Sequence, residues 1–202
     1  TATNDGKLVK VGPAPKFELV NQDNLKITNE TYKGKVYVLE FFFSTCPSIC
    51  PKMNQSMLLI EKKFFGNPNF GIAAITIDPA HDTPAVLKEN AKLKGVTSSN
   101  WHFLTGDKDY IYDLANKGVN LYAGENKKVS GGFEHSGFFA LIDKDGNIRC
   151  RRDDFGNPIF LPNQISNFLK SSYLLVFFIL VHSAFGISAT IVSSVSMSSI
   201  IM

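Results

Sequence analysis

The sequence predicts an α/β fold, a central mixed sheet flanked by helices, with a β-hairpin before it and a hydrophobic tail after it. Two apolar runs, at residues 36–43 and 70–77, are rich in β-branched and aromatic residues and have the length of strands buried on both faces. Segments with helical spacing follow both runs, so the connections cross over and the strands should be parallel. The turn sequence Asp143-Lys144-Asp145-Gly146 adds an antiparallel pair near the end of the domain.

Length, charge and cysteine count narrow the class of protein. The chain has 202 residues, enough for one ordinary domain with extra segments, and a formal net charge of +3. Its lysines and arginines are scattered, which argues against nucleic acid as a partner. One cysteine pair with a spare thiol does not make a disulfide scaffold. Because the sequence begins at Thr1 rather than at Met, we expect that any N-terminal signal or anchor has been removed or is not included.

The first part of the chain is predicted to be an arm followed by the hairpin. Residues 1–15 are polar and contain Gly12, Pro13 and Pro15, which is typical of a linker or arm; residues 16–170 form the main domain. Residues 16–20 and 25–28 alternate around a polar turn, which predicts the β-hairpin.

Two helices flank the second apolar strand. Apolar residues recur at helical spacing from Met53 to Phe65. Pro47 suits the first turn of this helix, because proline fixes φ and has no N–H to lose. The second helix is expected from Pro84 to about Lys94, with Asp82 or Thr83 as its cap.

The rest of the domain is predicted to alternate short strands with one further helix. The expected elements are a strand at 101–104, a helix at 108–117, a brief strand at 119–122, a glycine-rich loop at 124–134, and hairpin strands at 137–142 and 147–152.

The tail differs in composition from everything before it. Residues 173–202 contain no Asp, Glu, Lys or Arg, and residues 173–192 are mostly apolar. That stretch reaches the length of a membrane span. A non-native end and a disordered apolar tail are the alternatives, so membrane association is one of three interpretations of this segment.

Two cysteines carry the clearest chemical signal. Cys46 and Cys50 lie at the predicted start of a helix, where free N–H groups and the helix dipole stabilise a thiolate. Their spacing places both sulfurs on one face of a helical turn. A thiolate pair suits Cu(I) or Zn(II), and the same pair could close a disulfide. The alternative is a pair of buried, inert cysteines in the core.

Four separated motifs together resemble one known family. Residues 42–51 (FFSTCPSICP), 77–84 (IDPAHDTP), 101–106 (WHFLTG) and 135–138 (HSGF) occur in this order. They are similar to motifs of the Sco/SenC family, copper-handling proteins of cytochrome c oxidase assembly. The resemblance implies a thioredoxin-like fold, normally with an N-terminal membrane anchor. It also implies that copper, as Cu(I) or Cu(II), is bound by Cys46, Cys50 and His135.

The position of His135 fits a third ligand. It lies at the start of a predicted strand, after the glycine-rich loop. In thioredoxins a cis-proline faces the active cysteines from this place, and here no proline occurs between Pro84 and Pro158. Two thiolates favour Cu(I), and an added imidazole helps the site to accept Cu(II). Without the resemblance, a solvated loop residue would be the simpler interpretation.

Other candidate residues have weaker signals. Asp78 follows the second apolar strand and so lies at the same edge of the sheet as Cys46, where it could hydrogen-bond a copper ligand; it could equally be a turn residue. His81 is expected in solvent and His102 in a structural role. Cys150 has no partner in the pattern.

Two classes of function follow. The first is a copper metallochaperone that delivers copper to a cytochrome c oxidase subunit, with another copper carrier as a further partner. The second is a thiol–disulfide oxidoreductase that reduces the cysteines of that target, with Cys46 and Cys50 as its redox pair. His135 discriminates between them, because only a copper site needs it. A peroxidase is a distant third, because no activating threonine and arginine arrangement is evident near Cys46.

Both main functions would be located outside the cytoplasm. The expected place is the cell envelope, on the extracytoplasmic face of the cytoplasmic membrane, or the mitochondrial inner membrane, where a dithiol and its disulfide can interconvert.

Overall fold

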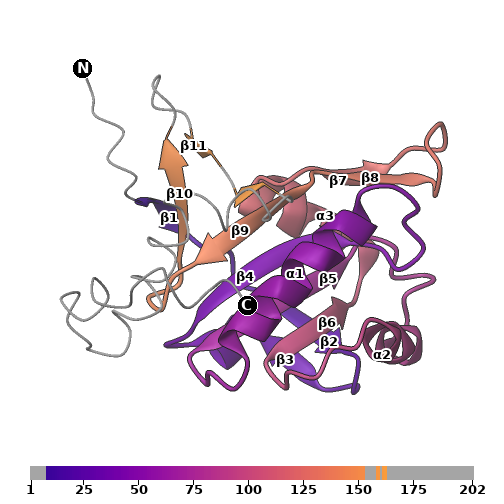
Figure 1. Ribbon diagram of the computed structural model, residues 1–202. Coiled ribbons are helices and arrows are strands. Elements are labelled where there is room, and N and C mark those ends of the chain that lie inside the picture. Colours follow the sequence, from indigo (N-terminus) through magenta and orange to yellow (C-terminus); the bar gives the residue numbers. More distant parts are fainter. Residues whose placement is uncertain (1–7, 153–157, 160, 163–202) are drawn as a thin grey trace, which may run out of the picture.

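One mixed sheet dominates the fold (Figure 1). The computed structural model describes residues 8–152, 158–159 and 161–162. The strand order there is β1-β10-β9-β4-β5-β6-β2-β3, and β11 and β12 pair with β10 and β9. The strands are β1 (Val9–Pro13), β2 (Glu18–Asn21), β3 (Lys26–Thr28), β4 (Val36–Phe42), β5 (Phe70–Thr76), β6 (Trp101–Thr105), β9 (Phe138–Ile142), β10 (Asn147–Arg152), β11 (Pro158–Ile159) and β12 (Leu161–Pro162).

The centre of the sheet is parallel, as predicted. In it β4 pairs with β5, and β5 with β6, so that Ala73 lies between Leu39 and His102. Every residue of β4 and β5 is buried, which explains why both strands are mainly apolar along their length rather than alternating. Antiparallel strands flank this centre, with β9 beside β4 and β2 beside β6. The predicted mixed sheet is therefore confirmed.

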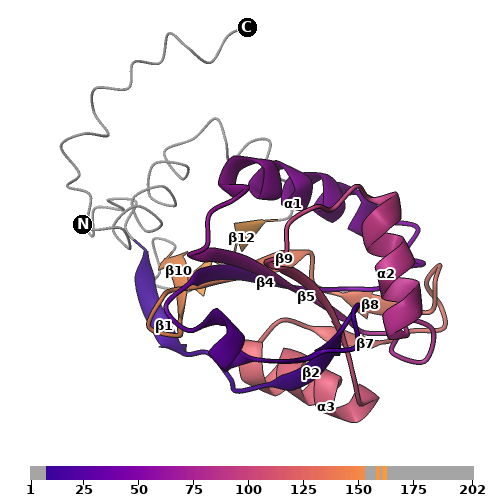
Figure 2. The same ribbon diagram turned by 90° about the horizontal axis from the view of Figure 1, so that it is seen from below.

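Helices cover both faces of the sheet. The helices α1 (Cys50–Phe64) and α2 (Pro84–Leu93) lie on one face, and α3 (Lys108–Asp113) lies on the other (Figure 2). The largest fully buried side chains in the core between these layers include Trp101, Phe41, Phe42, Phe103 and Phe139. Helix α2 begins as predicted, with the Thr83 hydroxyl accepting the Val86 N–H at 3.4 Å and Pro84 in its first turn.

Three predicted segments differ from the structure. The predicted arm at 1–15 contains the edge strand β1, which pairs with β10 so that Val9 lies opposite Cys150. The predicted strand at 119–122 is absent, because α3 continues as a wide helical turn (Leu114–Val119) that ends at Asn120 in the left-handed conformation, φ 60°. The predicted loop at 124–134 instead contains most of a two-stranded ribbon, β7 (Ala123–Glu125) and β8 (Phe133–His135).

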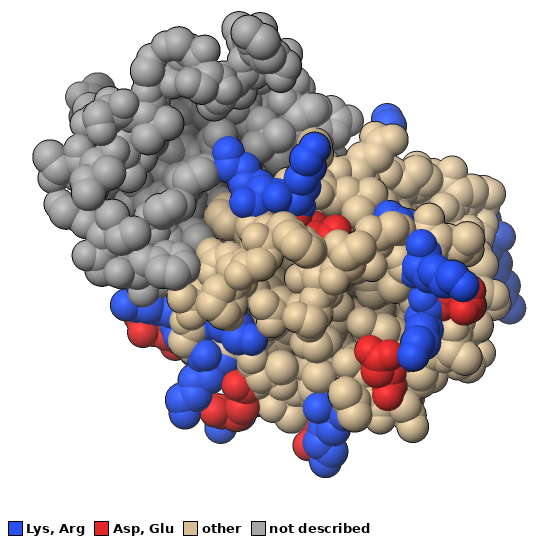
Figure 3. Space-filling model, turned by 60° about the horizontal axis from the view of Figure 1, so that its bottom comes forward, with Lys and Arg blue, Asp and Glu red and all other residues tan. Residues whose placement is uncertain are grey.

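The charged surface matches the scattered pattern of the sequence. Lys and Arg occupy several separate places on the face seen in Figure 3, some beside acidic side chains. Pairs of this kind include Lys26 with Glu18 and Lys88 with Asp23. No helix in the described ranges is long and apolar enough to cross a membrane. The predicted membrane span at 173–192 lies outside the described residues.

Candidate metal centre

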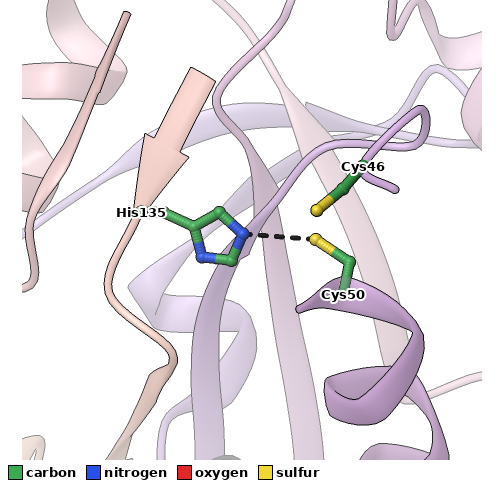
Figure 4. Close-up of side chains that lie close together, drawn as sticks. All are labelled: Cys46, Cys50 and His135. Carbon is green, nitrogen blue, oxygen red and sulfur yellow. Dashed lines mark hydrogen bonds between the residues drawn. The ribbon is translucent and has the colours of Figure 1, made fainter. Parts of the chain in front are cut away.

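Helix α1 begins one turn later than the sequence suggested. Its first residue is Cys50, and the proline in its first turn is Pro51 rather than Pro47. Cys46 therefore lies in the loop between β4 and α1, and the prediction that one helical turn holds both cysteines is wrong. The loop turns sharply instead, with the Cys46 N–H donating to the Phe43 carbonyl at 3.2 Å. This turn still directs the Cys46 sulfur toward Cys50 (Figure 4).

The third donor comes from the ribbon. His135 is the last residue of β8 and lies opposite Ala123 of β7. Its Nε2 lies 3.2 Å from the Cys50 Sγ (Figure 4), and its Nδ1 lies 3.1 Å from the Ser136 carbonyl oxygen. A carbonyl can only accept, so Nδ1 carries a proton, and in the neutral ring Nε2 is the nitrogen that is free to bind a metal. The donor atoms of Cys46, Cys50 and His135 all lie within 4.8 Å of one another.

The two thiols differ in acidity. A hydrogen bond from the Cys50 thiol, with smaller contributions from His135 and from backbone N–H groups, lowers the pKa of Cys46 to about 3, although burial opposes this. The same bond and burial raise the pKa of Cys50. The first proton of the pair is therefore lost from Cys46, which makes this sulfur the stronger nucleophile and metal ligand at neutral pH.

An open pocket of about 490 Å³ adjoins these donors. Its walls are mainly apolar and come from the cysteine loop and the ribbon. Phe43 packs against Phe133 with ring centroids 5.4 Å apart and meets the His135 ring edge-on at 6.0 Å. Gly131 (φ +91°) lets the ribbon approach the cysteine loop, because a Cβ there would lie 3.0 Å from Phe43 and 3.2 Å from Pro47.

The remaining predicted residues lie away from the sulfurs. Asp78 is half-buried and accepts the His81 N–H at 3.4 Å; among the described residues it makes no hydrogen bond to a cysteine or to His135, which fits the turn-residue alternative. His81 is half-exposed, as expected. His102 is structural, with Nδ1 3.2 Å from the Asn21 amide nitrogen, and burial lowers its pKa.

Two acidic residues near the site were not identified from the sequence as parts of it. Asp82, predicted only as a helix cap, is fully buried and binds Ser44 in the cysteine loop, while the cap itself is Thr83. Glu40 of β4 is also buried, and its Oε2 has no hydrogen-bond partner in the described residues. Burial raises the pKa of Glu40 to about 7. The sequence did offer one sign of Glu40's role, because an acidic residue inside an otherwise apolar predicted strand is unusual.

Comparison with known proteins decides the family. The family model described as SCO1/SenC matches residues 10–170. The chain belongs to the SCO1/SenC family. The "SCO1 protein homolog" of Bacillus subtilis is 32% identical over 138 residues, which is 65% of this chain and 69% of that protein. A "SCO2-like protein" of Rickettsia felis is 34% identical over 181 residues, which is 81% and 78% of the two chains.

Solved Sco structures share the fold. BsSco, described as a member of the Sco family of cytochrome c oxidase assembly proteins with a disulfide switch, has a TM-score of 0.64 at 26% identity, over 84% of this chain and 99% of its own. Yeast Sco1 with copper bound has a TM-score of 0.58 at 23% identity, over 92% and 96%, and at that identity the likeness concerns the fold alone. The predicted thioredoxin-like fold is confirmed.

Proposed function

We propose that this SCO1/SenC protein is a copper metallochaperone. It binds one copper ion through Cys46, Cys50 and His135 and delivers it to a cytochrome c oxidase subunit on the extracytoplasmic side of a membrane. The observation that carries the proposal is the convergence of two sulfurs and one imidazole nitrogen within 4.8 Å. Yeast Sco1, which shares this fold, has been solved with copper bound.

The donor set favours copper over zinc. Structural zinc sites normally use four protein ligands in a tetrahedron. In the described part of the chain no fourth His, Cys, Asp or Glu joins the three donors. Two thiolates satisfy Cu(I), which accepts low coordination numbers, and the imidazole adds the nitrogen that Cu(II) prefers. Because Nδ1 of His135 is bound to the Ser136 carbonyl, the ring is oriented with Nε2 toward the sulfurs.

The open pocket gives an acceptor access to the copper. Cys46 and His135 both line it, so a thiolate of the receiving protein could approach the ion while one of these donors still holds it. Transfer would then exchange ligands one at a time, without releasing free copper.

The test is metal binding by the reduced protein and by two variants. Cys46→Ser should lose both oxidation states of copper, because a hydroxyl is a poor ligand for Cu(I) and one thiolate alone holds the ion weakly. His135→Ala should keep Cu(I) and lose or strongly weaken Cu(II). The measurements are copper content and the visible thiolate-to-Cu(II) charge-transfer band. An unchanged band and stoichiometry in His135→Ala would contradict the assignment of His135 as a ligand.

A thiol–disulfide oxidoreductase is the second candidate function. The low pKa of Cys46 and the adjacent Cys50 favour it, as does the disulfide switch described for BsSco. In this reaction the Cys46 thiolate attacks a disulfide of the target, Cys50 resolves the mixed disulfide, and the target gains two thiols as the pair becomes a disulfide. If His135→Ala reduced a disulfide peptide at the wild-type rate and no variant or wild-type protein bound copper, this function would take precedence.

A further inference from the structure

Asp82 is the most heavily hydrogen-bonded carboxylate near the site. It lies in the turn between β5 and α2 and is fully buried. One oxygen accepts the Ser44 N–H at 3.0 Å and the Thr76 hydroxyl at 2.5 Å. The other oxygen accepts the Ser44 hydroxyl and lies 2.9 Å from His81 Nδ1. One side chain thus joins the cysteine loop, the end of β5 and the turn before α2.

The turn that carries Asp82 is itself firmly held. The Asp82 N–H donates to the Asp78 carbonyl at 2.8 Å, and the next residue, Thr83, caps α2. Ser44, by contrast, belongs to the irregular loop after β4, two residues before Cys46. Both its N–H and its hydroxyl bind Asp82, so the carboxylate fixes the loop at this point.

The three metal donors have different local support. Cys50 is part of α1, and His135 belongs to a strand and is oriented by the Ser136 carbonyl. Cys46 lies outside any helix or strand, so its sulfur is placed by the loop alone. We infer that Asp82 is the residue that positions Cys46 in the metal centre, and that it contributes more to the affinity for Cu(II) than to the affinity for Cu(I).

The difference between the oxidation states follows from their coordination. Cu(I) accepts two sulfur ligands and tolerates movement of either, whereas Cu(II) needs sulfur and nitrogen donors in a fixed arrangement. A residue that orients a ligand without touching the metal typically changes affinity by about 10- to 100-fold. The effect of Asp82 should therefore fall mainly on Cu(II). This part of the inference rests on the proposed copper function.

Asp82→Asn is the variant that tests the inference. It keeps the shape of the side chain but places an NH₂ group against donors that need an acceptor. We expect the affinity for Cu(II) to fall by about 10- to 100-fold, with a weaker thiolate-to-Cu(II) band, and the affinity for Cu(I) to fall less than about tenfold. Equal losses for both ions, or no loss of Cu(II), would overturn the inference.

Glu61→Gln is the matched control. Glu61 is also a buried carboxylate, and it accepts the N–H groups of Thr97 and Ser98 at 2.9 and 2.7 Å. It lies eleven residues beyond Cys50 on α1, about 16 Å along the helix. Its variant should lose stability without changing the ratio of Cu(II) to Cu(I) affinity. A ratio that shifts equally in both variants would show a general packing effect and overturn the inference.

A measurement without metal separates this inference from the copper proposal. Holding Cys46 near Cys50 raises the effective concentration of one thiol at the other, which favours their disulfide. In a glutathione buffer, the equilibrium constant for forming that disulfide should fall about tenfold in Asp82→Asn and stay unchanged in Glu61→Gln. If wild-type protein bound no copper, this result alone would decide the role of Asp82, and an unchanged constant would refute it.

If Asp82→Asn does not fold, two milder substitutions in the partners of Asp82 can test the same inference. Ser44→Ala removes one bond to the carboxylate and leaves the backbone bond in place. His81→Ala removes only the half-exposed partner. Ser44→Ala should reduce the Cu(II) affinity by a smaller factor in the same direction, and His81→Ala should have the smallest effect. The opposite order would contradict a role that acts through the cysteine loop.

Discussion

Strand β4 and the β7–β8 ribbon both lead into the metal centre, but they are supported very differently. All seven residues of β4 are buried, and the strand is paired on both sides, with β5 and with β9. The three residues of β8 are half-buried and pair only with β7 in the described structure. One half of the site is thus held by the core and the other by a ribbon.

This difference separates stability from ligand geometry. The core strand should determine how stable the protein is, because its side chains are enclosed on every side. The ribbon should influence how well the imidazole meets the sulfurs, with little effect on folding. Substitutions in β4 should therefore change mainly the free energy of unfolding, and substitutions in the ribbon should change mainly the affinity for copper.

The largest effect on stability is expected in the core. Phe42 of β4 is fully buried and meets Phe103 edge-on, with ring centroids 5.6 Å apart. Phe42→Ala should lower the free energy of unfolding by about 3–5 kcal/mol, because it removes buried apolar surface and leaves a cavity. Phe65→Ala is the control, since Phe65 is 64% exposed and its loss should change stability by about 0.5 kcal/mol or less. Urea unfolding measures both, and similar values for the two variants would contradict the prediction.

The next largest effect on stability is expected from Glu40, the buried carboxyl of β4. Burial raises the pKa of Glu40 from 4.5 to about 7, so the folded state binds this proton more tightly than the unfolded state does. The stabilisation is complete below about pH 4.5 and is lost as the pH rises through about 7. Wild-type protein should therefore lose about 3 kcal/mol of stability from this group between pH 4.5 and 8.

Glu40→Gln should remove this pH dependence, because the amide stays neutral at every pH. Unfolding measured at pH 5 and pH 8 should show a smaller difference in the variant than in the wild type. A wild-type curve that runs parallel to the variant curve would mean that Glu40 does not hold a proton in the folded protein.

The smallest stability effect, with a visible effect on copper, is expected in the ribbon. Phe133 is half-buried and packs on Phe43 beside the imidazole. Phe133→Ala should lower the free energy of unfolding by about 1 kcal/mol, because little surface is buried there. The affinity for Cu(II) should fall about tenfold, since the contact that orients the ribbon is lost. The comparison between strand and ribbon fails if this variant destabilises the protein as much as Phe42→Ala.

The sequence predicts the core of this fold well, because strands that are buried on both faces are recognisable as apolar stretches. Strands β4 and β5 appear as mainly apolar runs, and α2 has its cap and its Pro84. The ribbon and β1 contain no such stretch. They are short, polar or rich in glycine, and β1 pairs with a strand far away in the chain.

The sequence could predict that Cys46, Cys50 and His135 come together, but not the structure that supports them. The two cysteines and His135 were identified by spacing and by the family motifs, yet the start of α1 at Cys50 was not. Asp78 and Asp82 lie four residues apart in one loop. Which of two such carboxylates points inward depends on the path of the turn, and the sequence alone does not determine that path.

Gly131 links the two halves of the site at a point that holds no ligand. Its turn rests against Phe43 and Pro47, where a Cβ would be too close to both. His135 lies four residues further along the ribbon, about 13 Å away if the chain is extended. The turn and the imidazole belong to the same two-stranded ribbon, so the ribbon connects this contact to His135. The glycine at this turn thus helps to set how closely the ribbon, and with it the imidazole, approaches the cysteine loop.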